Sequence, residues 1–142
     1  MKFIILSTLL SLFSYFSCAQ KAHDILIGAN ADLIKSDNAG FFEKGQGSVE
    51  VNYYFNRKFS GTSGVEWWTS DQFSLALGAR WFPIDEAYIR IRGLIGEQDL
   101  SVGAGWAKPV QGNFRIEAMA DLYFSGHIAI RAGIGYVIKR KK

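Results

Sequence analysis

The segment Ile128–Ile138 reads Ile-Ala-Ile-Arg-Ala-Gly-Ile-Gly-Tyr-Val-Ile, and it decides how the rest of the chain is interpreted. Side chains alternate between the two faces of a strand, so the isoleucines, Ala132 and Tyr136 share one face. The opposite face carries Arg131 and mostly small side chains. At eleven residues the segment is long enough to cross a bilayer as a tilted strand. One apolar face opposite a small or charged face is the pattern of a membrane β-barrel strand.

The same alternation recurs along the chain, whereas helical spacing is hard to find. Segments rich in Gly, Pro, Asn and Asp separate the alternating runs and predict turns. We therefore expect an all-β fold, an eight-stranded antiparallel up-and-down transmembrane β-barrel. The last hairpin is expected to turn at Ser125-Gly126-His127, which would set Asp121 directly across from Arg131. The expected strands cover residues 24–34, 45–55, 59–69, 73–81, 87–96, 100–107, 114–124 and 128–138.

The first nineteen residues have the features of a secretory signal peptide. Lys2 supplies a positive start, residues 3–16 are apolar, and Ser17-Cys18-Ala19 provides small residues before a cleavage site. We predict a signal peptide over 1–19 and one barrel domain over 20–142. Two alternatives stay open, namely a retained membrane anchor and lipidation of Cys18 in place of its removal.

Charge and cysteine content exclude several kinds of chemistry. Cleavage removes the single cysteine, which leaves the mature chain without disulfide or thiol chemistry. The chain has 16 basic and 13 acidic residues, so loss of Lys2 leaves 15 against 13, a net charge of +2. This mild balance gives no electrostatic reason to expect a nucleic acid partner. Beyond the signal no apolar run approaches the roughly 18 residues of a membrane helix, so a membrane-spanning chain would cross with strands.

The polar face decides whether the apolar face points outward into lipid or inward around a ligand, as in soluble barrels. Within the strands the polar face carries five acids, five arginines and no lysine. Arginine suits enclosed ion-pair networks because its planar fork makes two hydrogen bonds to one carboxylate. Arginines turned towards lipid would each cost about 2–4 kcal/mol near the midplane. We therefore predict a lumen ion-pair network of Asp32, Glu50, Glu66, Arg80, Arg90, Arg92, Arg115, Glu117, Asp121 and Arg131.

Glycines and aromatic residues fit the same arrangement. An eight-stranded barrel has an interior only just wide enough for side chains, so long arginines need glycines opposite them. These inward glycines are Gly28, Gly64, Gly78, Gly103, Gly105, Gly133 and Gly135. Outward aromatic residues gather near the strand ends, as they do at membrane interfaces. The predicted aromatic belt consists of Tyr53, Phe55, Phe59, Trp81, Trp106, Phe114 and Tyr136 at one rim, with Trp67, Phe73 and Phe124 at the other.

The pattern Arg131-x-Gly133-x-x-Tyr136-x-Ile138 resembles the C-terminal insertion signal of outer-membrane proteins, in which a polar residue, a glycine, an aromatic and a final hydrophobic residue recur. It departs from that signal in the aliphatic Ile138, where an aromatic is commoner, and in the basic residues that follow. The whole mature chain is similar to small outer-membrane β-barrels of the OmpA/OmpX type, of the porin-like superfamily. The resemblance implies insertion by the barrel-assembly machinery, periplasmic termini and a place in the outer membrane of a Gram-negative cell. It also implies long surface loops, and here only 35–44 is long, which argues against adhesion through large loops.

Polar residues near the last hairpin raise the question of catalysis. Ser125 and His127 are two residues apart, with Glu117 and Asp121 one strand away, as an acyl hydrolase acting on outer-membrane lipid would need. The Ser-Gly-His segment already has a turn explanation and no catalytic signature surrounds it, so no catalytic residue is predicted. His23 and His127 fall at opposite rims, so neither a metal nor a cofactor is expected.

The sequence therefore favours a non-enzymatic integral outer-membrane barrel with a structural or surface-interaction role. Its expected surroundings are outer-membrane lipids, and the expected form is a monomer. The lumen is expected to be held shut, because open aqueous channels need wider barrels. Three other functions stay open: an enzyme that modifies lipid A or phospholipid, a soluble periplasmic ligand-binding β-barrel, and a narrow channel.

Overall fold

The computed structural model describes residues 21–35, 46–68, 72–96 and 99–140. Each strand runs 9 to 11 residues, the length with which a tilted strand crosses a bilayer. No helix among the described residues is long and apolar enough to span a membrane. The strands are β1 (Ile25–Lys35), β2 (Gln46–Tyr54), β3 (Phe59–Trp68), β4 (Phe73–Trp81), β5 (Ala87–Ile95), β6 (Asp99–Pro109), β7 (Phe114–Tyr123) and β8 (Ile128–Ile138).

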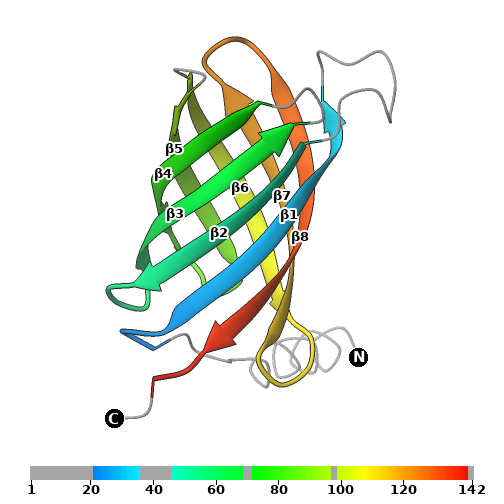
Figure 1. Cartoon of the computed structure of the whole chain (residues 1–142). Helices are drawn as coiled ribbons and strands as arrows, with labels where there is room; N and C mark the ends of the chain where they lie inside the picture. Colours follow the sequence, from blue (N-terminus) through cyan, green and yellow to red (C-terminus); the bar gives the residue numbers. More distant parts are fainter. Residues whose placement is uncertain (1–20, 36–45, 69–71, 97–98, 141–142) are drawn as a thin grey trace, which may run out of the picture.

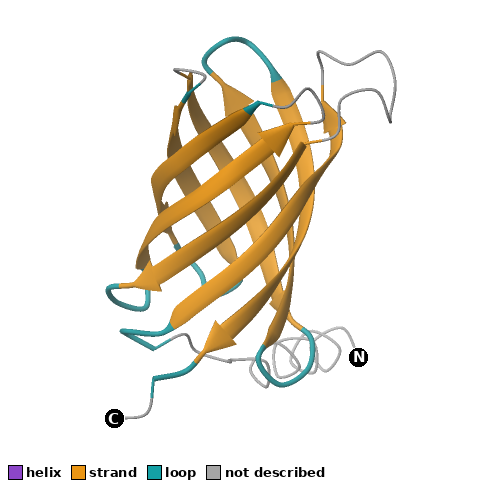
Figure 2. Ribbon diagram, in the orientation of Figure 1, coloured by secondary structure: helices purple, strands orange, loops and turns teal. Residues whose placement is uncertain are grey.

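The strands close into one antiparallel barrel in up-and-down order (Figure 1 and Figure 2), which confirms the predicted fold class. Every strand pairs with its neighbours in sequence, and β1 pairs with β8 to complete the ring. At this closing seam Ile25 lies opposite Ile138, and Ala31 lies opposite Ala132. Closure leaves no sheet edge with unpaired backbone groups, which is the condition for a sheet to lie in hydrocarbon.

The two ends of the barrel carry different segments (Figure 1). One end, here called the terminal end, holds the start of β1, the end of β8 and the turns 55–58, 82–86 and 110–113. The opposite end, here called the loop end, holds the ends of β1, β3, β5 and β7 and the β7–β8 turn. His23 precedes β1 at the terminal end, whereas His127 lies in the β7–β8 turn at the loop end, so the two histidines are at opposite rims as predicted.

Apolar side chains cover the outside of the barrel. Burial alternates residue by residue along β7, where every second residue from Phe114 onward is exposed. Ile91, Ile134 and Leu122 are 52–61% exposed at outward strand positions, although large aliphatic residues of this kind are mostly buried in soluble proteins. Among the outward strand positions whose side chains the structure describes, Lys108 is the one charged residue. The barrel wall therefore has its apolar face outward and its polar face towards the lumen, as the sequence pattern predicts.

Two apolar clusters lie inside the barrel, one towards each end. The larger is at the terminal end, where Phe82 follows β4 and turns back into the lumen. Its ring centroid is 5.6 Å from that of Tyr54 and 5.3 Å from that of Tyr88. The terminal-end cluster contains Leu26, Tyr54, Phe82, Tyr88, Ala107 and Val137, and the loop-end cluster contains Ala76, Leu94, Tyr123 and Ala129. The charged residues of the lumen are left between them.

The register of the last hairpin corrects one prediction from the sequence. The sequence predicts that Asp121 lies directly across from Arg131, and this prediction is wrong. Asp121 pairs with Ala129, and Arg131 pairs with Met119. The difference is two positions in the pairing, so both residues keep the predicted inward face. The two side chains still approach each other within the lumen, with Arg131 Nε 3.6 Å from Asp121 Oδ2.

A glycine explains the changed register. Gly126 has a φ of +96°, a left-handed conformation that glycine adopts without steric cost. Tyr123 N donates to His127 O over 2.8 Å, so the three-residue loop covers residues 124–126 and ends on this glycine. The turn therefore begins one residue earlier than the sequence prediction of Ser125-Gly126-His127.

Two further departures concern strand limits. β6 continues through Pro109, which pairs with Arg115, whereas the sequence places this proline in the turn. In β1 the register with β8 shifts between Asp32 and Ile34, and this bulge turns two consecutive apolar residues, Leu33 and Ile34, outward. The predicted signal peptide at 1–19 and most of the long connection at 35–44 lie outside the described residues.

Candidate functional site: the ion-paired lumen

The charged residues predicted for the lumen all point into the barrel. Their side chains are at most 5% exposed, although every one of them carries a formal charge. They come from every strand except β6, whose inward positions are occupied by small residues such as Gly103 and Ala107. The ten are Asp32 (β1), Glu50 (β2), Glu66 (β3), Arg80 (β4), Arg90 and Arg92 (β5), Arg115, Glu117 and Asp121 (β7), and Arg131 (β8).

Glu50 occupies the centre of the network. Its carboxylate accepts a hydrogen bond of 2.6 Å from Arg80 Nη2 through Oε2. Its other oxygen accepts from Arg92 Nη1 over 3.1 Å and from Arg90 Nη1 over 3.4 Å. One fully buried carboxylate therefore neutralises part of the charge of three arginines that reach it from two other strands.

Two further acids share the arginines of β5. Asp121 accepts a hydrogen bond of 2.9 Å from Arg90 Nε and one of 3.0 Å from Arg92 Nη2. A second bond from Arg90 makes that pair bidentate. Arg92 also donates to Glu66, whose other oxygen accepts from Gln46 Nε2 over 2.5 Å. Bidentate charge-assisted pairs of this kind fix side-chain geometry as well as charge.

The network continues to both sides of this centre. Towards the terminal end, Arg80 Nη1 donates to both oxygens of Glu117 over 3.1–3.2 Å. The guanidinium carbon of Arg80 also lies 4.6 Å from the ring centroid of Tyr88, a cation–π distance. On the other side, Arg131 Nη1 lies 2.7 Å from Glu66 Oε1 and its Nε lies 2.5 Å from Asp32 Oδ1. Nine of the ten predicted residues are thus linked into one set of ion pairs.

Arg115 has different partners from the other arginines. Its Nη1 donates to the hydroxyl of Tyr54 over 3.3 Å, and its Nη2 donates to the carbonyl oxygen of Ala107 over 3.4 Å. Both partners belong to the terminal-end cluster, so these two hydrogen bonds hold Arg115 against the apolar cluster at this end.

The energetics of such a network depend on its completeness. Moving an ion into a protein interior costs several kcal/mol, and a buried pair regains this only when its partners are well placed. Here each guanidinium meets at least one acceptor and each carboxylate meets at least one donor among the described residues. The carboxylates are engaged as acceptors of arginine, so the arrangement is suited to holding opposite walls together and filling the lumen.

Glycines provide the room that these side chains need. A Cβ at Gly103 would lie 2.0 Å from Asp121 Oδ1 and 2.6 Å from the carbonyl oxygen of Ala120. A Cβ at Gly105 would lie 2.4 Å from the ring of Tyr88. Neither gap could be filled without displacing a member of the network or of the terminal-end cluster.

Substitution of Gly103 by alanine is expected to lower the free energy of unfolding by about 1–3 kcal/mol, the usual cost of overpacking. The added methyl group would push Asp121 away from Arg90 and Arg92. The matched control is Gly28→Ala, another inward glycine, where the new Cβ would meet its nearest atom at an ordinary 3.7 Å. Urea unfolding of both variants in lipid vesicles checks this; equal stability of the two would contradict the packing argument.

Several lumen residues are absent from the predicted network. Tyr54, Tyr88 and Tyr123 all bond its members, for example Tyr123, whose hydroxyl accepts from Arg131 Nη2 over 2.8 Å. All three tyrosines lie on the polar face of the alternating pattern, and this was the feature of the sequence that could have identified them. Asp24, 3% exposed, precedes β1 and accepts a hydrogen bond from the backbone N of Lys21. The expected strand 24–34 already put Asp24 on the polar face, but the predicted network did not include it.

The aromatic belt residues lie on the outer face, and most are more than 40% exposed. At the terminal end Phe114 and Tyr136 pack edge to face with centroids 5.1 Å apart, and Tyr53 and Phe55 do so at 5.4 Å. The Tyr53 hydroxyl lies 2.7 Å from His23 Nδ1. In the predicted insertion signal, Arg131 and Gly133 face inward whereas Tyr136 and Ile138 face outward. Its use as a signal stays a prediction.

The candidate catalytic residues are not brought together. Ser125 Oγ donates to Asp99 Oδ2 over 2.8 Å on the exposed surface of the loop end. Glu117 and Asp121 instead bind arginines inside the lumen. Among the described residues, no three His, Cys, Asp or Glu side chains are grouped in a way that could hold a metal ion.

Comparisons with known proteins address the fold. No family model matches the chain, and no curated protein matches it. A de novo designed transmembrane β-barrel superposes with a TM-score of 0.67 at 14% identity, covering 84% of this chain and 99% of the designed one. The designed barrel TMB2.3, solved by NMR in solution, gives 0.66 at 16% identity, covering 85% and 98%.

A natural protein is also similar, although more distantly. The KdgM porin, solved in complex with disordered oligogalacturonate, gives a TM-score of 0.37 at 12% identity, covering 80% of this chain and 98% of the porin. That superposition is too loose to support an argument. The similarity to the designed barrels, together with the closed topology, the apolar exterior and the strand lengths, shows that this chain has the fold of a small eight-stranded transmembrane β-barrel.

Proposed function

We propose that this protein is an integral outer-membrane β-barrel without enzymatic activity, whose lumen is closed and whose role is structural or one of surface interaction. The observation that carries the proposal is the ion-pair network, which fills the lumen between two apolar clusters. In this proposal residues 1–19 direct export and the barrel-assembly machinery inserts the chain. The inserted barrel is a monomer surrounded by outer-membrane lipid, with its terminal end in the periplasm.

The outer face supports a membrane location. Its mid-strand positions carry aliphatic side chains such as Leu77, Ile91 and Ile130, each 44–52% exposed. A water-soluble protein rarely exposes so continuous an apolar surface. Aromatic side chains occur at both rims of this band, the position that aromatic residues favour in membrane proteins.

The burial of the arginines supports a closed lumen. Arg80, Arg90, Arg92 and Arg131 are 1–2% exposed, although arginines lining an aqueous channel would be hydrated. Eight strands enclose an interior that side chains can fill, whereas open porins have 16–18 strands. The terminal-end cluster around Phe82 places a further apolar layer across the same path.

Two measurements on one preparation test the proposal. The outer-membrane fraction is expected to contain a band whose gel mobility changes on boiling, because a folded barrel resists the detergent until it is heated. The purified protein in planar bilayers is expected to give no discrete conductance steps. Discrete steps in conductance would show that the protein is a narrow channel and not a closed barrel. A soluble band with unchanged gel mobility would exclude the membrane location. Release of fatty acid from lipid by the purified protein would exclude the non-enzymatic role.

A further inference from the structure

A depression interrupts the apolar outer face on β5 to β8. The strand register places outward residues in rows, and one row runs Ile89, Ala104, Ala120 and Ile130 across these four strands. Two alanines in the middle of the row are therefore flanked by two isoleucines. The next row towards the loop end is filled by large residues, namely Ile91, Val102, Leu122 and Ile128. The wall is hollow where the alanines lie.

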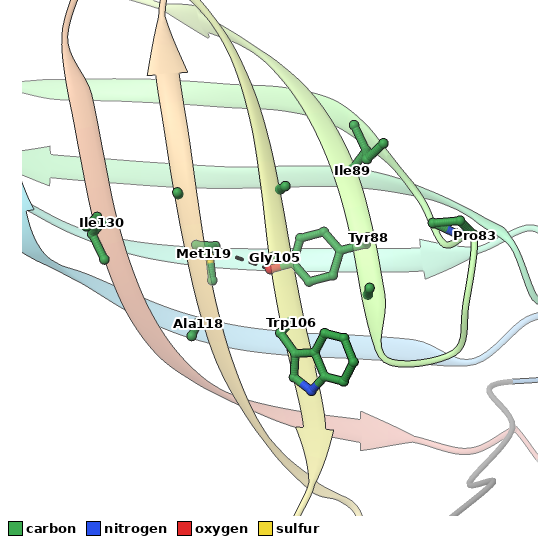
Figure 3. Close-up of a pocket in the computed structure, with 11 residues that line it drawn as sticks. Pro83, Tyr88, Ile89, Gly105, Trp106, Ala118, Met119 and Ile130 are labelled. Atoms are coloured by element: carbon green, nitrogen blue, oxygen red, sulfur yellow. Dashed lines mark hydrogen bonds between the residues drawn. The ribbon is translucent and has the colours of Figure 1, made fainter. Parts of the chain in front are cut away.

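The hollow continues towards the terminal end. The next row is Ala87, Trp106, Ala118 and Ala132, so small residues again surround one large side chain. Figure 3 shows Ile89 and Ile130 on the two sides, with Ala118 and Trp106 between them and Pro83 near the rim. The depression has a volume of about 540 Å³, within the range of sites that hold small ligands. Its lining is almost entirely apolar.

A cation lies beyond the terminal end of the depression. Lys108 follows Trp106 by two residues on the same outward face of β6, opposite Ile116 of β7. It is exposed and forms no ion pair with any of the described residues. An apolar depression that ends in a tryptophan and a lysine at the membrane rim matches the parts of a phospholipid, since lysine binds phosphate as a point charge and its stem lies along apolar surface.

We propose that this depression binds one anionic phospholipid, with an acyl chain over Ala104, Ala118 and Ala120 and the phosphate on Lys108. The inference rests on the membrane location proposed above. It assigns the site to the leaflet at the terminal end, because Lys108 and Pro83 are at that rim. An acyl chain in the hollow would contact the apolar surface around Ala104 and Ala120, which the flanking large side chains of the wall do not cover.

A second copy of the barrel fits the same surface less well. Two barrels that share a membrane orientation meet about an axis along the membrane normal, and such an interface places the same patch on both sides. Two concave patches would face each other and leave the hollow unfilled. Lys108 of each copy would also approach its counterpart, an unfavourable pairing of like charges.

Native mass spectrometry tests the site directly. The full-length protein is folded into vesicles of equal parts phosphatidylglycerol and phosphatidylcholine and then released in mild detergent. The mass of the intact barrel then shows which lipid, and how many molecules of it, remain bound. The variant Ala104→Leu/Ala120→Leu fills the hollow, and Lys108→Gln removes the charge. Matched controls are Ala29→Leu/Ala79→Leu, two outward alanines elsewhere on the wall, and Lys58→Gln in the β2–β3 turn at the same rim.

The expected result is one phosphatidylglycerol adduct on the native protein, reduced about tenfold in the filled variant. The preference for phosphatidylglycerol over phosphatidylcholine should fall about fivefold in Lys108→Gln. Both controls should match the native protein.

An adduct that persists equally in the filled variant overturns the inference, because the lipid is then bound around the barrel and not at this depression. A native dimer that the filled variant abolishes overturns it in favour of a second copy. Loss of the heat-modifiable band in the native protein would instead reject the membrane location itself.

Discussion

Replacing Glu50 by alanine is expected to lower the free energy of unfolding of the barrel by about 3–5 kcal/mol. The change removes a fully buried carboxylate that bonds three arginines, and it leaves four carboxylates for five arginines among the lumen residues. Arg80 and Arg90 are also direct neighbours in the β4–β5 register, so their repulsion would be less well screened. Urea unfolding in lipid vesicles, followed by tryptophan fluorescence, measures the difference.

Two further variants make this result specific. Glu86→Ala removes a carboxylate from the β4–β5 turn and is expected to change stability by no more than about 0.5 kcal/mol. The double variant Glu50→Ala/Arg92→Ala should be more stable, by about 0.5–3 kcal/mol, than the sum of the single losses predicts, because one charge is then removed with its partner. Strict additivity would show that the two side chains do not interact.

Introducing arginine at Leu77 is the prediction with the next largest effect. Leu77 lies in the middle of β4, points outward and is 45% exposed. In a bilayer an outward arginine at mid-depth should lower the free energy of unfolding by about 2–4 kcal/mol. The same change at Ile84, in the β4–β5 turn and 56% exposed, should cost about 0–1 kcal/mol because the side chain there reaches water. Equal costs at the two positions, measured in vesicles, would mean that the outer face is not in lipid.

The sequence was sufficient to predict the barrel and the direction of its faces. Period-2 alternation set which residues lie inside, and this survived the error in the last hairpin because a shift of two positions preserves the face. The choice of arginine over lysine on one face, seen at Arg90 and Arg131, indicated an enclosed location. Both signals are local, so they can be read one strand at a time.

The pairing of the charges could not be predicted in the same way. Arg80 meets Glu50 and Glu117 across the lumen, and these contacts depend on how the tilt and stagger of eight strands place distant side chains at one height. Phe82 lay outside the expected strand 73–81, whereas in the structure the alternation that turns it inward continues one residue past the end of β4. The turn at Gly126 had two three-residue solutions, and only the backbone conformation separates them.

The cross-lumen pairs also bear on how long the folded barrel persists. They join residues 26 to 65 positions apart, and most connect strands that are not neighbours in the sheet. Such contacts can form only when opposite walls already face each other, so we expect them to form after the rate-limiting step of assembly. Interactions absent from a transition state slow unfolding and leave the folding rate nearly unchanged. We therefore expect the arginines of the lumen to lengthen the lifetime of the folded barrel without slowing its folding.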